Sequence, residues 1–133
     1  MHLHNQKLLL NWYLCALTLE RSLLYERIEK RIDQMISMGL IDETNQLMEK
    51  FGRDAFALGS IGYRHCRNYI DGIWNKDEMV YQLKLDTRHY AKRQLIWFRK
   101  IKEIHWYTPD KLDEMKKDVE HFLNLSSGTQ ENL

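Results

Sequence analysis

Apolar and polar positions alternate along this chain in patterns that predict several helices and few strands. The most apolar stretch covers residues 8–19. It is too short to span a bilayer, and Asn11 and Thr18 make it too polar. It also lacks the basic flank and cleavage site of a signal peptide. We therefore expect a strand here that is buried on both faces.

Residues 23–38 place apolar side chains at helical spacing, which predicts one amphipathic helix that ends at Gly39. Its apolar face consists of Leu24, Ile28, Ile32, Met35 and Ile36. Two further helices are predicted over residues 41–50 and 60–71, each followed by a glycine.

The clearest helix start lies at Asn75, where Glu78 three residues later is typical of a capping box. No helix breaker follows before Lys102, so we expect a helix of about seven turns.

The remaining C-terminal sequence predicts a short extended segment and a last helix. Residues 104–107 read as extended, and Thr108 with Pro109 predicts a helix that runs to about Leu123. Residues 126–133 are polar and predict a disordered tail. The expected fold is mainly α, with one or two short strands, in a single domain over residues 1–125.

Composition adds little until charge is mapped along the chain. The formal net charge is only +1. Residues 84–102, however, hold seven Lys or Arg against one acid, and residues 103–133 hold seven acids against three Lys. Cys15 and Cys66 match no metal spacing and read as reduced thiols of a cytosolic protein. No metal ligands are predicted, including at His2 and His4 near the terminus.

The predicted helix that begins after Asn75 has a basic face and an apolar, aromatic face. The basic sector holds Lys84, Arg88, Lys92, Leu95 and Arg99. The opposite sector holds Leu83, Thr87, Tyr90, Ala91, Gln94, Trp97 and Phe98. A positive stripe suits a phosphate backbone, because each neutralised phosphate releases a counterion. The alternative is an ordinary solvated face, although the stripe has few interspersed acids and Gln94 falls among apolar residues.

Two smaller groups of residues also suggest phosphate or base contacts. Arg27 and Arg31 are four residues apart, so they share a helix face and can grip phosphate oxygens with paired guanidinium groups. They could equally pair with neighbouring acids (Glu26, Glu29 and Asp33). Gly62, Tyr63 and Arg64 combine backbone freedom, a stacking ring and a cation, which is a weak signal alone.

Five segments together resemble the tRNA dimethylallyltransferase family, in order and spacing, over about residues 17–107. They are LYERIEKRIDQM (24–35), GLIDE (39–43), SIGYR (60–64), TRHYAKRQLIWFR (87–99) and IHW (104–106). The resemblance implies the C-terminal part of a P-loop-kinase-like α/β core with an inserted helical domain. It also implies transfer of a dimethylallyl group from dimethylallyl diphosphate to N6 of the adenine 3′-adjacent to the anticodon, with Mg²⁺ required by the intact enzyme.

Carried over by resemblance, the diphosphate-binding candidates are Arg27, Arg31 and, more weakly, Arg21. The tRNA-binding candidates are Tyr63, Arg64, Arg88, Lys92, Arg93, Gln94, Trp97 and Arg99. Gln94 and Trp97 have the alternative role of fixing the helix to the core. Gly59 departs from the family pattern, in which a longer polar residue is usual.

The catalytic apparatus implied by the resemblance lies outside this sequence. There is no G-x-x-x-x-G-K-[S/T] phosphate loop, and the family's catalytic aspartate belongs to the N-terminal half. We therefore expect a chain that is inactive alone, holds no Mg²⁺ by its own residues, and works with the P-loop half, tRNA and dimethylallyl diphosphate.

Two alternatives remain: a stand-alone helical RNA-binding module, and a helical protein with no special surface. A strand at residues 8–19 without its neighbours further predicts exposed apolar surface, and hence dimerisation, a partner or low stability.

Overall fold

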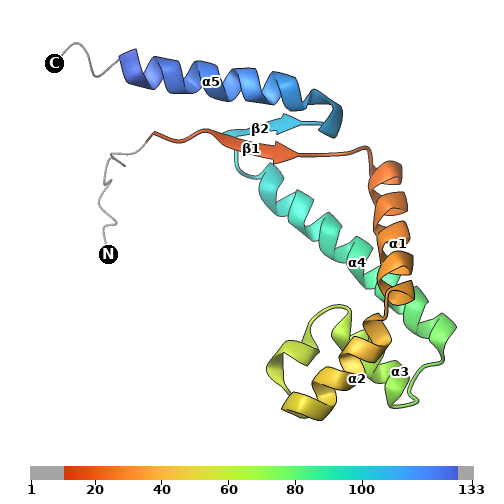
Figure 1. The fold of residues 1–133 in the computed structure, drawn as a ribbon. Helices are drawn as coiled ribbons and strands as arrows, with labels where there is room; N and C mark the ends of the chain where they lie inside the picture. The colour runs from red at the N-terminus through yellow and green to blue at the C-terminus, as the bar shows by residue number, and fades with distance from the viewer. Residues whose placement is uncertain (1–10, 129–133) are drawn as a thin grey trace, which may run out of the picture. The chain divides into compact units, whose positions relative to one another are not determined.

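The computed structural model describes residues 11–128, which form two compact units. One unit is the helical segment Glu20–Trp97. The other combines the described residues before Glu20 with those from Phe98 onward, so the helical unit is inserted in sequence between two strands. This confirms the prediction of a mainly α chain with few strands (Figure 1).

The helical unit consists of four α-helices and one 3₁₀ turn. They are α1 (Arg21–Ser37), α2 (Leu40–Phe51), the turn η1 (Phe56–Gly59), α3 (Tyr63–Ile70) and α4 (Lys76–Arg99), whose last residues belong to the other unit. Gly39 has a φ of 105° between α1 and α2, a left-handed conformation that favours glycine and separates the two helices.

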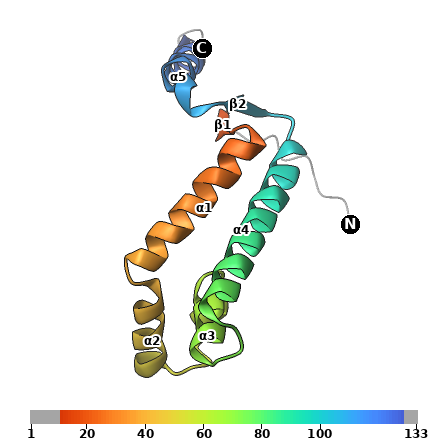
Figure 2. The same cartoon turned by 90° about the vertical axis from the view of Figure 1, so that its right-hand side faces the viewer.

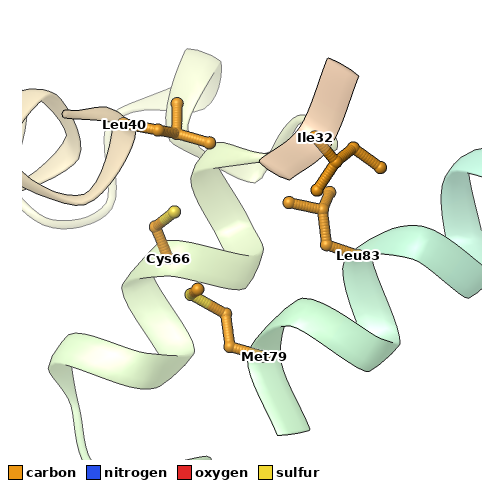
Figure 3. Packing of buried hydrophobic residues seen from close by; sticks show 5 residues of the cluster. All are labelled: Ile32, Leu40, Cys66, Met79 and Leu83. Carbon is orange, nitrogen blue, oxygen red and sulfur yellow. The ribbon is translucent and has the colours of Figure 1, made fainter. Parts of the chain in front are cut away.

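The core of the helical unit forms where α1, α2, α3 and α4 meet. Ile32, Leu40, Cys66, Met79 and Leu83 are buried there and point toward one another (Figure 3). Their removal from water is the main stabilising term of this unit. The apolar face predicted for residues 23–38 is confirmed, because the face that holds Ile32 packs against this cluster.

The predicted start of α4 is confirmed by its capping geometry. The side-chain oxygen of Asn75 accepts a hydrogen bond from the backbone N–H of Glu78 at 2.8 Å. This bond satisfies one of the amide groups that every helix leaves unpaired at its first turn. α4 and α1 then run side by side (Figure 2).

The second unit contains a two-stranded parallel sheet and a C-terminal helix. β1 (Leu14–Leu17) pairs with β2 (Ile104–Tyr107), with Leu14 opposite Ile104 and Leu17 opposite Tyr107. The predicted extended segment at residues 104–107 is thus confirmed. A 3₁₀ turn, η2 (Pro109–Lys111), then leads into α5 (Leu112–Gly128).

The expectation of a long strand buried on both faces is wrong for the described part of residues 8–19. β1 has only four residues, and Leu14 and Leu17 are 38% and 53% exposed. Trp12 just before the strand is 51% exposed. The physical reason is that, within residues 11–128, β1 has a single strand partner, whereas burial on both faces requires further layers. Residues 8–10 lie outside the described residues. The exposed apolar surface agrees with the expectation for a strand without its neighbours.

Several predicted helix boundaries shift. α3 begins at Tyr63 rather than residue 60, because Ser60 is extended and Gly62 has a φ of 94°. α4 ends at Arg99 rather than Lys102. α5 continues to Gly128, five residues past the predicted end, and residues 129–133 lie outside the described residues. Along the described chain, every helix is too short or too polar to cross a membrane.

Candidate functional site

Arg27 and Arg31 project from one ridge of α1, and both are exposed. Within residues 11–128 neither side chain forms an ion pair. Two of the three acids that could have neutralised them are engaged elsewhere. Glu29 accepts from Arg88 at 2.6 Å, and Asp33 pairs with Lys84 at 2.9 Å.

These ion pairs bear on the two interpretations of the arginines. Local pairing with Glu29 or Asp33 is absent, because both carboxylates face α4 instead. The two guanidinium groups therefore stand four residues apart with donors directed to solvent, which is the arrangement that suits a polyanionic group. Arg21 is also exposed, but it is the first residue of α1 and lies roughly 120° around the helix from Arg27.

The basic face predicted for α4 divides into two parts. Lys84 and Arg88 are half-buried against α1 through the ion pairs described above. Lys92 and Arg93 are exposed, and neither forms an ion pair within the described residues. Arg88 was predicted to contact RNA, yet in this structure its charge is matched by Glu29. The α4 sequence has few acids of its own, and acids of α1 pair with its half-buried cations.

The opposite face of α4 is likewise buried only at its start. Leu83 is 1% exposed, whereas Gln94 is exposed and Trp97 is 59% exposed. The amide of Gln94 therefore needs no buried partner. Arg99 is the last residue of α4 and belongs to the strand-containing unit. Lys92, Arg93 and Gln94 form one exposed polar segment of the helical unit.

The Gly62-Tyr63-Arg64 motif forms the start of α3. Gly62 has φ and ψ of 94° and −65°, which a side chain would strain. The hydroxyl of Tyr63 donates to Glu43 at 2.7 Å, and this hydrogen bond raises the pKa of Tyr63. The ring lines two hollows of about 380 and 480 Å³, the first with Met35 and Ile61 among its walls.

A buried histidine joins this motif to α4. His65 is fully buried, and its Nδ1 accepts the backbone N–H of Gly62 at 3.2 Å. Its Nε2 lies 2.7 Å from Asp86 Oδ2, and the same oxygen accepts from Arg64 at 3.2 Å. Burial lowers the pKa of His65, and the neighbouring Arg64 acts in the same direction. Partial burial opposes ionisation of Asp86, but its bonds to His65 and Arg64 outweigh this and lower the pKa of the carboxyl.

His65 and Asp86 were missed by sequence reasoning, although one signal was present. Asp86 is the lone acid among seven basic residues of the segment 84–102. A single carboxylate in such a segment indicates a specific partner. His65 carries no comparable signal, because a histidine in the first turn of a helix is usually exposed.

A second polar group lies in the strand-containing unit. The hydroxyl groups of Tyr13 and Tyr107 are 2.6 Å apart, and Tyr107 donates to Asp118 of α5 at 2.7 Å. These bonds, the one to Tyr13 foremost, raise the pKa of Tyr107. The ring of Tyr13 also stacks on His105 at 4.2 Å. The group fixes α5 to the sheet.

Metal ligands do not gather in the described part of the chain. Over residues 11–128, no three His, Cys, Asp or Glu side chains are placed to hold one ion. Cys66 is buried in the core, which raises the pKa of its thiol.

Comparison with known proteins assigns the fold and these segments to one family. The model of the family described as IPP transferase matches residues 2–101. A tRNA dimethylallyltransferase of Thermotoga petrophila is 41% identical over 115 residues, which cover 84% of this chain and 38% of that relative. One of Geobacillus thermodenitrificans is 40% identical over 123 residues, which cover 92% of this chain and 39% of that protein.

Solved structures agree with this assignment. The crystal structure of a full-length tRNA isopentenylpyrophosphate transferase from Bacillus halodurans matches with a TM-score of 0.83 and 35% identity, covering 90% of this chain and 42% of that one. This chain therefore belongs to the IPP transferase family. It spans about two fifths of the length of the curated relatives it matches.

Proposed function

We propose that this chain is the C-terminal part of a tRNA dimethylallyltransferase and supplies the surfaces that hold its two substrates. Family membership and the names of the relatives support the general activity. The finer proposal is that Arg27 and Arg31 hold the diphosphate of dimethylallyl diphosphate. Tyr63, Arg64 and the exposed segment at Lys92 and Arg93 would contact the tRNA anticodon stem-loop.

One observation carries the diphosphate assignment. Arg27 and Arg31 form no ion pair within the described residues, and Glu29 and Asp33 of the same helix bind α4 instead. Exposed arginines usually gain little by staying unpaired beside three acids of the same helix. Two guanidinium groups on one helix face, each with paired N–H donors, match the spacing and charge of a diphosphate better than a single lysine would.

The test is calorimetric titration of the 133-residue chain with inorganic diphosphate. Arg27→Ala with Arg31→Ala should abolish measurable binding. Arg27→Lys with Arg31→Lys keeps the positive charge but loses the two-pronged guanidinium donors. This variant should retain part of the diphosphate binding. Lys30→Ala removes an exposed charge from the same helix and serves as the matched control. Equal losses in the Lys30 variant and the double alanine variant would overturn the assignment.

By itself, the chain should not catalyse the transfer. The phosphate loop is absent from its sequence, and by resemblance the catalytic aspartate belongs to the N-terminal half of the family's fold. Incubation with tRNA and dimethylallyl diphosphate should therefore yield no N6-modified adenine. Turnover by the purified chain would refute this. RNA binding without any diphosphate binding would favour the alternative, a stand-alone helical RNA-binding module.

A further inference from the structure

His65 is a buried titratable side chain for which the proposed function so far has no use. Its two ring nitrogens join two segments that are distant in sequence. Nδ1 accepts from the Gly62 backbone at 3.2 Å, and Nε2 meets Asp86 of α4 at 2.7 Å. A fully buried polar ring with both nitrogens engaged holds a specific geometry, since either nitrogen left unpaired would be costly.

The hydrogen-bond directions fix the tautomer of this imidazole. A backbone N–H can only donate, so the Nδ1 atom that meets Gly62 must carry a lone pair. The ring proton therefore lies on Nε2 and is donated to Asp86. The charged groups around the ring are Arg64 of α3 and Asp86 of α4. Glu43 of α2 bonds to the neighbouring Tyr63.

Asp86 also determines where the Arg64 side chain lies. The same carboxylate oxygen accepts from His65 and from Arg64, so the guanidinium is held against α4 by one of its nitrogens. The other donors of the guanidinium remain available. Arg93 follows Asp86 by seven residues on α4, which is two turns and about 10.5 Å along the same helix face.

Resting on the proposed function, we infer that His65 and Asp86 are positioning residues that set Arg64 at a fixed spacing from Arg93 for contacts with the RNA phosphate backbone. The imidazole holds the Gly62 turn, and the carboxylate holds the guanidinium. Neither side chain touches the RNA in this arrangement. Asp86 is thus a negative charge on a basic surface. Removal of its carboxylate should nevertheless weaken RNA binding.

The sign of the change in RNA affinity on Asp86→Ala distinguishes a positioning role from a simple effect of net charge. Asp86→Ala and Asp33→Ala each remove one carboxylate that pairs with a cation of this unit. If only net charge matters, both substitutions raise affinity for an anticodon stem-loop RNA. Positioning predicts that Asp86→Ala lowers affinity roughly threefold to tenfold, the range for the net contribution of one typical hydrogen bond, while Asp33→Ala does not lower it.

A double-mutant cycle identifies the residue through which Asp86 acts. In an Arg64→Ala background, Asp86→Ala should cause no further loss of affinity. His65→Gln offers an amide oxygen and an amide N–H that can replace the two ring nitrogens, so it should retain affinity, whereas His65→Leu should lose it. Amide exchange at Gly62 should be slow in the unaltered chain and fast in His65→Leu, independently of RNA.

An affinity gain in Asp86→Ala, or a loss that persists without Arg64, overturns the inference while the proposed function stands. Absence of RNA binding by the unaltered chain removes the RNA part of the proposed function and this inference together. Diphosphate binding is measured separately and is expected to be the same in Asp86→Ala and the unaltered chain.

Discussion

The division of the α4 basic face leads to a quantitative prediction about salt. Lys84 and Arg88 are matched by acids of α1, whereas Lys92 and Arg93 are exposed without ion pairs in the described part of the chain. Only the second pair should release counterions when RNA binds. Lys92→Ala with Arg93→Ala should therefore weaken the salt dependence of affinity, and Lys84→Ala with Arg88→Ala should not.

The magnitude follows from the number of phosphate contacts. Each cation that neutralises a phosphate contributes about 0.7 to the slope of log K against log salt for a single strand, and about 0.9 for a duplex. Loss of two contacts should reduce the slope by about 1.4 to 1.8. Between about 50 and 200 mM salt, affinity of the variant should then fall about tenfold less than that of the unaltered chain.

Fluorescence anisotropy with a labelled anticodon stem-loop, repeated across this salt range, measures both slopes. The Lys84 and Arg88 variant removes the same formal charge from the same helix and is the matched control. An equal reduction of slope in both variants would refute the reasoning. It would mean that the ion pairs with Glu29 and Asp33 open when RNA binds, and that Arg88 contacts RNA as the family resemblance implies.

Two further predictions concern the helical unit. Leu83 is 1% exposed at the junction of α1 and α4, so Leu83→Ala should lower the free energy of unfolding in urea by about 2–5 kcal/mol. Leu23→Ala, at a side chain 48% exposed, should change it by no more than about 0.5 kcal/mol, and equal losses would contradict the assigned core. Burial lowers the pKa of His65 in the folded chain, so its contribution to stability is complete above the unfolded pKa of about 6.5 and is lost as pH falls through the folded value. Unfolding measured from pH 7.5 to pH 5 should show this loss in the unaltered chain and less of it in His65→Gln; identical pH profiles would contradict it.

Local signals in the sequence predicted much of the fold. Asn75 begins α4 as expected because its cap bond forms between residues three apart, and Gly39 ends α1 because the conformation there depends on one residue. The exposure of β1 could not be predicted in this way. Whether Leu14 and Leu17 are covered depends on other layers, about which the pattern of a strand says nothing.

The candidate site shows the same limit. Sequence spacing placed Arg27 with Arg31, and Lys84 with Arg88, on common helix faces, and the structure has them there. It could not show which acids pair with which cations. The pairing of Glu29 with Arg88 and the contacts of Asp86 link residues 59 and 21 or 22 positions apart. Such contacts are set by helix packing, so only the structure separates matched cations from available ones.

The central claim is that one chain holds two substrate surfaces, with diphosphate on α1 and RNA on α3 and α4. Amide shifts of the ¹⁵N-labelled chain, titrated separately with dimethylallyl diphosphate and with an anticodon stem-loop, test it most directly. The account predicts that the diphosphate ester perturbs residues around Arg27 and Arg31, while RNA perturbs those around Arg64 and Lys92–Arg93. Perturbation of the same residues by both ligands, or of neither region, would contradict it.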